Sequence, residues 1–295
     1  MTNATNDARI TDLGPVGVWL GPLRAAPVDT QRQAVTRFEE LGYGSVWEGE
    51  GVGSNDVFVQ EAVWLSATRR IVAGSGIANI WARHPGTARA AAATLGEAWP
   101  GRFILGLGVS HAPMVNRSGQ KYERPLDRMR EYLDGFGDRP FPVPVVLAAL
   151  RPRMLELAAE RTDGAHTYFV PPEHTAQARE VLGPDRLLLP EQAVVLETDP
   201  ATARATARRH TAFYLQMPNY VNNLKRLGFT DDDLADNGSD RLVDTIVAWG
   251  DPETVAARIR AHLEAGADHV LIQPLAADIK DAVHQLEELK PVLDR

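Results

Sequence analysis

Residues 71–111 read IVAGSGIANIWARHPGTARAAAATLGEAWPGRFILGLGVSH. Two apolar segments, each ending in small and polar residues, flank one alanine-rich segment that starts at His84-Pro85 and has helical character. A strand, a helix and a strand at this spacing form a βαβ unit, which requires a parallel sheet with its strand C-termini at one edge. Glycines 76, 106 and 108 then lie at strand ends, where the backbone itself meets a ligand.

The same alternation runs along the rest of the chain. Further strands are predicted at residues 16–20, 45–50, 145–150, 165–170, 192–198 and 269–275. Eight strands alternating with helices in 295 residues match a (β/α)8 TIM barrel, an α/β fold, here as one domain over residues 1–295. A doubly wound nucleotide-binding fold is the alternative, but it needs a Gly-x-Gly-x-x-Gly turn after its first strand, and this chain has GPLRAAP there.

Residues 199–250 interrupt this alternation with a helical insertion before the last strand. The insertion carries FYLQMPNYVNNLKRLGF (213–229) and the acidic run Asp231–Asp233. Extra material beside the active-site face of a barrel is a lid, a dimer contact or a cover for the outer helices, and the sequence leaves all three open. The acidic run is expected to be a solvated helix start.

Composition excludes several classes of partner and site. The formal charge of −8 comes without a basic run, which argues against nucleic acid and anionic membranes as partners. The first ten residues lack a secretion pattern and no apolar run reaches 18 residues, so a cytoplasmic protein is expected. There is no cysteine, no His-Glu-x-x-His and no Gly-x-Ser-x-Gly, so neither a metal site nor a serine or cysteine nucleophile is predicted.

Specific side chains gather where the predicted strands end. Trp19 ends the first strand, Trp47, Glu48 and Glu50 end the second, Ser75, Gly76 and Asn79 end the third, and Ser110 and His111 end the fourth. Since parallel strands bring their C-termini to one edge, these residues are expected to line one pocket. Small residues dominate it, so a flat, anionic ligand is expected there.

Four segments resemble the bacterial luciferase-like superfamily, and within it the coenzyme F420-dependent oxidoreductases. They are GYGSVWEGE (42–50), GSGIANIWARHP (74–85), EAWPGRFILGLGVSHAP (97–113) and GDPETVAARIRAHLEAGADHVLIQ (250–273). The likeness extends over about residues 14–290. It implies a TIM barrel with a deazaflavin across its C-terminal mouth, a non-proline cis peptide at Ser75-Gly76 and a homodimer.

The resemblance also implies a set of cofactor-binding residues. They are Ser75, Gly76, Ile77, Asn79, Gly108, Val109, Ser110, Ala149, Arg151 and Tyr168. The loops 149–154 and 168–172 are expected to hold the phosphate end through backbone N–H groups and a helix N-terminus. Relatives often have glycine where Arg151 stands, so Arg151 is either a direct phosphate ligand or a solvated arginine that begins a helix.

For catalysis, a reduced deazaflavin donates hydride, and the protein has to orient the substrate and manage one proton. His111 suits the proton role by residue type and position, and Glu48 either orients His111 or carries the proton itself. Trp19, Trp47, Glu50 and Trp81 are predicted walls of the substrate pocket, although the tryptophans suit a barrel core equally well. Two alternatives to an F420-dependent oxidoreductase stay open: an FMN-dependent monooxygenase, and a flavin- or F420-binding protein without turnover.

Overall fold

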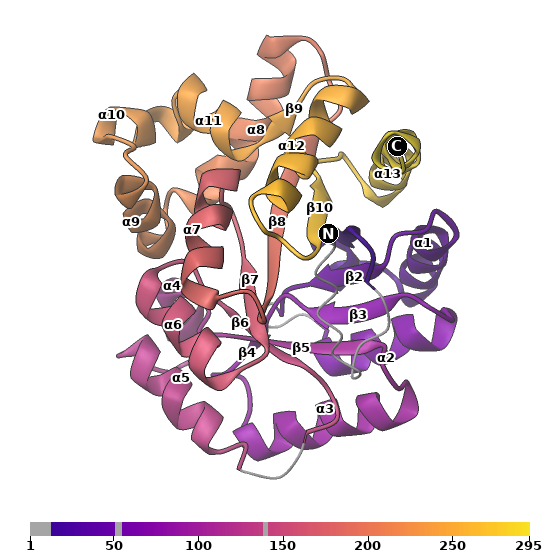
Figure 1. Cartoon of the computed structure of the whole chain (residues 1–295), viewed down its shortest axis with the longest axis vertical. Helices are drawn as coiled ribbons and strands as arrows, with labels where there is room; N and C mark the ends of the chain where they lie inside the picture. Colours follow the sequence, from indigo (N-terminus) through magenta and orange to yellow (C-terminus); the bar gives the residue numbers. More distant parts are fainter. Residues whose placement is uncertain (1–12, 51–54, 138–140) are drawn as a thin grey trace.

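The computed structural model describes residues 13–50, 55–137 and 141–295, and its centre is a closed barrel of eight parallel strands (Figure 1). The order around the barrel is β10-β1-β2-β3-β5-β6-β7-β8, and β8 pairs with β10 to close it. The strands are β1 (Val16–Trp19), β2 (Ser45–Glu48), β3 (Val72–Ser75), β5 (Phe103–Gly108), β6 (Val145–Ala148), β7 (Gly164–Thr167), β8 (Leu187–Val195) and β10 (Val270–Pro274). The predicted TIM barrel is confirmed.

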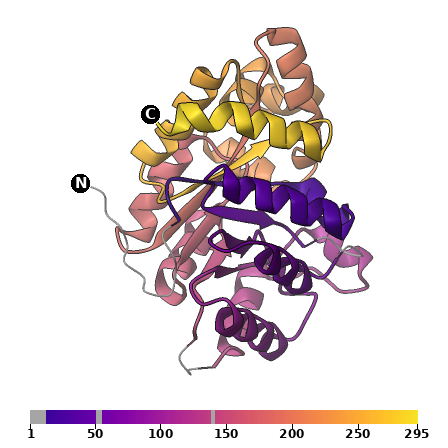
Figure 2. The same cartoon turned by 90° about the vertical axis from the view of Figure 1, so that its right-hand side faces the viewer.

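Helices surround the barrel, and α1 and α13 lie side by side on one flank (Figure 2). Those that follow barrel strands are α1 (Val28–Glu40), α2 (Val57–Ala67), α3 (Pro85–Ala98), α4 (Ala112–Arg117), α5 (Pro125–Asp134), α6 (Pro152–Arg161), α7 (Pro172–Leu182), α12 (Pro252–Glu264) and α13 (Ile279–Leu293). A 3-10 turn, η1 (Gly21–Ala25), follows β1. In the described parts of the chain, no helix is both long and apolar enough to cross a membrane.

Two apolar cores follow from the two-residue period of the strands. Val72, Ile104 and Leu271 lie in the cluster that fills the barrel, whereas their neighbours Ala73 and Leu105 pack between the sheet and the helices. Successive side chains of a strand point to opposite faces, so strands buried on both faces are apolar throughout. Each fully buried Leu or Ile contributes about 1.5–3 kcal/mol to folding.

β8 begins at Leu187, five residues before the start predicted at residue 192. Pro190 and Glu191 interrupt the apolar run Leu187–Leu189 and conceal the strand, because proline and glutamate are both rare in buried strands. The structure accommodates them in register, with Pro190 opposite Thr167 of β7 and Glu191 opposite Leu271 of β10. A carboxyl group is thereby brought into the barrel wall.

β3 and β5 separate near their C-terminal ends, and this separation shapes the mouth. Their pairing ends at Gly74↔Ile104, and a short strand β4 (Ala78–Asn79) resumes it. In the gap, the Ser75 hydroxyl accepts a hydrogen bond from Gly106 N (2.9 Å) and donates one to Gly106 O (3.1 Å). A Cβ on Gly106 would lie 1.9 Å from Ser75 O, so only glycine permits this approach.

The cis peptide bond lies at Gly76-Ile77, so the prediction of Ser75-Gly76 is wrong by one residue. The hydroxyl of Ser75 binds both backbone groups of Gly106, which keeps Ser75 within β3.

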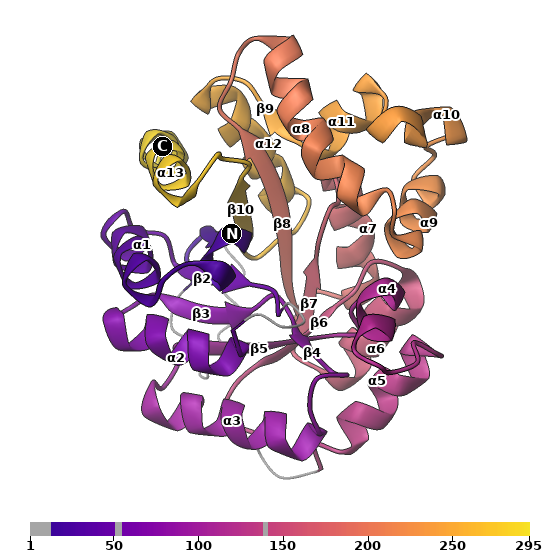
Figure 3. The same ribbon diagram turned by 180° about the vertical axis from the view of Figure 1, so that it is seen from behind.

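The predicted insertion is present between β8 and the last barrel strand. It comprises α8 (Pro200–Tyr214), α9 (Pro218–Arg226), α10 (Asp231–Leu234), η2 (Ala235–Asn237) and α11 (Asp240–Ile246), followed by a short strand β9 (Ala248–Trp249) that pairs with β8. These helices gather on one side of the barrel, with α9 beside α4 (Figures 1 and 3). The acidic run is solvated only in part: Asp233 is 9% exposed and binds Thr230, Ser239 and Arg241.

Candidate active site

Residues from four barrel strands and from the insertion meet in a ring around the C-terminal mouth. Trp19 Nε1 faces Gly76, where an added Cβ would lie 2.7 Å away, and Gly108 faces Ile77 in the same way at 2.3 Å. The Trp19 ring lies 5.2 Å from that of Tyr168. Tyr220 of α9 completes the ring of contacts, since it packs 6.3 Å from Tyr168 and 5.4 Å from His111.

Some residues of this ring are partly exposed. Gly76, Ile77, Val109 and Ser110 are each partly exposed, and all belong to the ends of β3 and β5. Ser110 has a φ of 55°, a left-handed conformation that few residues other than glycine adopt. The structure therefore brings together the predicted cofactor residues of these two strands.

Glu48, at the end of β2, is a buried carboxyl group with an unused oxygen. It is 2% exposed, and its Oε1 accepts a hydrogen bond from Gly49 N at 2.8 Å. Arg24 lies 3.6 Å from the same oxygen, while Oε2 has no hydrogen-bond partner among the described residues. Burial raises the pKa of Glu48 to about 8, against the lowering effect of Arg24 and of backbone N–H groups. Glu48 is therefore mainly a protonated acid at neutral pH.

Glu50 lies only two residues further on but has a different environment. Its carboxylate forms an ion pair with Arg83 and accepts a hydrogen bond from Asn79 N at 2.8 Å. Arg83 also reaches Asp56 at 2.9 Å. Glu50 thus holds the loop after β3 in place, and its charge is already compensated.

His111 begins α4 and is partly buried. Its Nδ1 lies 3.2 Å from Asn219 Oδ1, and its ring packs against Tyr220. Burial lowers the pKa of His111, and the hydrogen bond to Asn219 opposes this effect. The imidazole is therefore neutral at pH 7.

Three other predicted residues have structural partners. Asn79 is 4% exposed, and its Oδ1 accepts from Trp81 N at 3.0 Å, which closes a local turn. Trp81 donates its indole N–H to Val109 O at 2.9 Å and lies beneath Arg128. The structure places Trp47 inside the barrel instead of on the predicted pocket wall, because Gly74 leaves room for its fully buried ring.

The residues predicted for the phosphate end lie on neighbouring strands. Ala149 is 2% exposed, and its N–H donates to His166 O of β7 at 3.1 Å. Arg151 is exposed and precedes the first turn of α6, with no side-chain cap on that helix. Tyr168 is 9% exposed and binds both Tyr214 and Gln273 through its hydroxyl, each at 2.7 Å. Arg151 is therefore the solvent-facing member of this group.

The sequence interpretation missed another buried acid, Glu191. It is 1% exposed, its Oε2 accepts from Phe169 N at 3.1 Å, and burial raises its pKa to about 8. Phe169 has a φ of 59°, so Glu191 supports a left-handed residue directly after Tyr168. A glutamate within the apolar segment LLLPEQAVVL was the available indication.

The insertion supplies further residues that the sequence did not single out for the site. Tyr214 packs 5.2 Å from Tyr168, and burial raises the pKa of its hydroxyl above the ordinary value, so this hydroxyl stays protonated. Asn219 and Tyr220 both contact His111. No local pattern marks these three residues, because their contacts join segments more than 40 residues apart.

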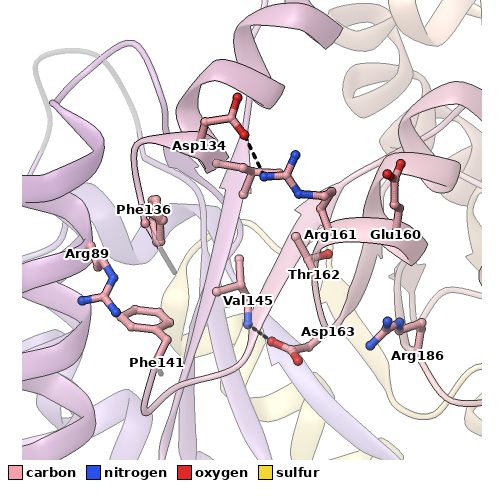
Figure 4. Close-up of a pocket in the computed structure, with 12 residues that line it drawn as sticks. Arg89, Asp134, Phe136, Phe141, Val145, Glu160, Arg161, Thr162, Asp163 and Arg186 are labelled. Atoms are coloured by element: carbon pink, nitrogen blue, oxygen red, sulfur yellow. Dashed lines mark hydrogen bonds and ion pairs between the residues drawn. The ribbon is translucent and has the colours of Figure 1, made fainter. Parts of the chain in front are cut away.

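Two surface pockets lie away from this mouth. One, of about 590 Å³, is lined by residues of α3, α5 and α6 that include Arg89, Asp134, Phe141 and Arg161 (Figure 4). The other, of about 650 Å³, lies among α11, β9 and α12. Neither is lined by residues that end β1, β2, β3 or β5. Among the described residues, no group of three or more His, Asp or Glu side chains is arranged to hold a metal ion.

The sequence was compared with protein families and with known proteins. A family model described as luciferase-like monooxygenase matches residues 11–136 and 134–269. A Mycobacterium tuberculosis protein, whose name assigns it provisionally to the coenzyme F420-dependent oxidoreductases, is 26% identical over 89% of this chain and 96% of its own.

Solved structures share the fold. The coenzyme F420-dependent tetrahydromethanopterin reductase from Methanopyrus kandleri is 19% identical over 94% of this chain and 99% of its own, with a TM-score of 0.75. The oxygenating constituent of 3,6-diketocamphane monooxygenase from Pseudomonas putida, in complex with FMN, is 15% identical over 95% of this chain and 98% of its own, with a TM-score of 0.71. Proteins similar to this chain thus include both F420- and FMN-linked enzymes.

Proposed function

We propose that this chain, which belongs to the luciferase-like monooxygenase family, is an oxidoreductase that uses coenzyme F420 to transfer hydride to or from a small or medium organic molecule. The observation that carries the proposal is the protonated Glu48 with its unused Oε2, next to part-exposed strand-end backbone. The cofactor is named from the relative that is 26% identical over 89% of this chain.

The residues present fit such a cofactor. A flat ring needs a surface with few protruding side chains, and Gly76, which follows β3 and is part-exposed, has no side chain. We assign the ring to the backbone of Gly76-Ile77 and of Gly108–Ser110. Trp19 Nε1 is a buried donor that has no partner in the described chain, so it offers a hydrogen bond at the same place.

The phosphate end is assigned to the start of α6. Arg151 is exposed there, and the first N–H groups of this ten-residue helix have no side-chain cap. A helix N-terminus with an adjacent guanidinium favours an anionic group such as a phosphate. When bound, the deazaflavin supplies the hydride chemistry, and the protein supplies orientation and proton control.

Glu48 is the proposed proton donor and His111 the proposed second proton-handling group. With a pKa of about 8, Glu48 keeps its proton at pH 7 and loses it above pH 8. His111 has a lowered pKa and is neutral there, so it accepts a proton. Glu48 has a raised pKa and can donate a proton, whereas His111 has a lowered pKa and can accept one. Such a pair suits a reaction in which one proton is given to the substrate or taken from it.

FMN-dependent monooxygenation is the second candidate. It is favoured by the P. putida monooxygenase, which shares the fold and was solved with FMN. The two cofactors share a tricyclic ring and a phosphate-bearing side chain, so the residues assigned above suit either of them. The distinction depends on whether the loaded protein reacts with oxygen.

A parallel fluorescence titration of the purified protein with F420 and with FMN tests the proposal. Micromolar or tighter binding of F420 with much weaker FMN binding is expected, and Arg151→Gln is expected to weaken it at least tenfold. Arg161→Gln, a change of the same type at the C-terminal end of α6, is the control. Preference for FMN would move the function to the flavin class, and binding of neither would refute both.

A further inference from the structure

The first turn of α9 brings one polar side chain of the insertion to the candidate active site. Asn219 Oδ1 lies 3.2 Å from His111 Nδ1, although 108 positions separate the two residues. Tyr220, the next residue, packs its ring 5.4 Å from the imidazole at an angle of 44°. The insertion therefore touches the proposed proton-handling histidine with two consecutive side chains.

The remaining contacts of His111 fix its position. Its backbone carbonyl accepts hydrogen bonds from Met114 N and Val115 N, each at 3.0 Å, at the start of α4. Tyr220 is itself held between Tyr168 and Tyr214, at 6.3 and 5.1 Å. The imidazole is thus held by its backbone, by an aromatic face and by one hydrogen bond.

Chemistry gives that hydrogen bond a direction. An amide oxygen only accepts, so Nδ1 has to carry the hydrogen. In a neutral imidazole the other nitrogen, Nε2, then carries a lone pair and no hydrogen. Asn219 therefore selects one of the two neutral tautomers.

Among the described residues, no charged side chain influences the tautomer of His111. The pKa of His111 is lowered by burial and raised by Asn219, and no charged side chain of the described elements acts on it. The titratable group packed against it is Tyr220, whose pKa is raised well above 10 by burial, so it is neutral. The tautomer is set by one neutral hydrogen bond.

We infer that Asn219 is a positioning residue, which holds His111 as the Nδ1–H tautomer and so keeps Nε2 free to accept a proton from the substrate. The inference rests on the proposed function for its catalytic consequence. Its structural part, the tautomer, stands without any cofactor. The insertion then completes the active site by supplying the hydrogen-bond partner of its base.

The test is NMR of the full chain labelled with ¹⁵N-histidine, with His111 assigned through His111→Gln. The wild type is expected to show the Nδ1–H tautomer at pH 8. Asn219→Leu is expected to lose this preference, and Asn219→Asp to raise the pKa of His111 by at least one unit, because it places a carboxylate beside the ring. Asn222→Leu, on the exposed face of α9, is the matched control and is expected to change neither value.

Measurement of turnover tests the catalytic consequence of the tautomer separately from the tautomer itself. Asn219→Leu is expected to lower kcat at least tenfold with little change in KM, and Asn219→Asp to shift the acid limb of the pH–rate profile upward. An Nδ1 without hydrogen in the wild type, or a tautomer unchanged by Asn219→Leu, would overturn the inference. If the tautomer depends on Asn219 but F420 does not bind, the proposed function fails and the positioning stands. Thermal unfolding confirms that each variant is folded.

Discussion

Charged side chains have different surroundings at the C-terminal mouth and at a pocket on the flank of the barrel. At the C-terminal mouth, Glu48 is buried with an unused oxygen and its pKa is raised to about 8. Around the 590 Å³ pocket on the flank formed by α3, α5 and α6, Arg161 lies 2.8 Å from Asp134, and Asp163 accepts from Val145 N at 2.8 Å (Figure 4). Arg161, Asp134 and Asp163 at the pocket have partners, whereas Oε2 of Glu48 at the mouth has none among the described residues.

Open volume alone therefore does not mark the candidate site. Burying a polar atom without a partner costs about 1–3 kcal/mol, so the unused oxygen of Glu48 at the strand ends makes the mouth a candidate for ligand binding. Exposed ion pairs contribute about 0–1 kcal/mol and are common on any surface. Substitutions at the C-terminal mouth and at the flank pocket test this contrast.

The largest expected effect is on turnover by Glu48→Gln. Removal of the acidic proton while the shape is kept should lower kcat at least 100-fold, the usual contribution of a general acid. Glu160→Gln, the same change at the exposed edge of the other pocket, should leave kcat within twofold. Steady-state kinetics with F420 measures kcat for both variants. An equal loss of kcat in the two would show that the mouth and the flank pocket do not differ in this respect.

A smaller effect is expected on stability from Gly106→Ala. The new Cβ would lie 1.9 Å from the backbone oxygen of Ser75, so β3 and β5 must move apart, at a cost of about 3 kcal/mol in unfolding free energy. Gly86→Ala in the first turn of α3 meets only the His84 side chain, at 3.2 Å, and should stay within about 1 kcal/mol of the wild type. Urea unfolding compares the two, and a neutral Gly106→Ala would show that the strands separate freely.

The third effect is a pH dependence that Glu191→Gln removes. Glu191 has a pKa of about 8 in the folded protein and the ordinary value of 4.5 when unfolded. Between these values the folded state keeps a proton that the unfolded state has lost. Its contribution is therefore complete below pH 4.5, decreases by about 1.4 kcal/mol per pH unit, and is lost above pH 8.

Glu191→Gln should consequently gain stability over the wild type as pH rises from 5 to 8, and match it near pH 4.5. Denaturant unfolding at several pH values measures the difference. Glu160→Gln should show no such trend, since Glu160 is exposed. A constant difference for Glu191→Gln across this range would mean that Glu191 is ionised in the folded protein.

The smallest effect is expected from Arg161→Gln. Its ion pair with Asp134 joins side chains that are 37% and 65% exposed, so its loss should cost less than about 0.5 kcal/mol, and salt should weaken even that. Thermal unfolding at low and high ionic strength measures this. A loss above 2 kcal/mol would make the flank pocket a structural site as well.

Much of the architecture followed from local pattern. Alternating apolar strands and helices predicted the barrel. The sequence also predicted that Gly76 and Gly108 lie at strand ends, and the structure has them there. Glu48 and His111 lie at the ends of β2 and β5, as expected from the parallel arrangement. These features depend on periodicity within about fifteen residues, which a sequence displays directly.

Other features depended on contacts between distant segments. Glu48 and Glu50 are equivalent in the sequence, yet Arg83 compensates the charge of Glu50, and Glu48 is left with an unused oxygen. Glu191 looked like an interruption of a strand and is another buried acid.

The sequence was enough to predict the barrel, its eight strands and the edge at which the candidate site residues lie, because hydrophobic period and glycine position are local properties. Tertiary structure alone decided which carboxyl groups stay protonated, which residue carries the cis bond and which asparagine faces His111. The physical reason is that pKa values and hydrogen-bond partners depend on desolvation and on neighbours from distant parts of the chain. Those neighbours are brought together only when the barrel closes and the insertion packs against its mouth.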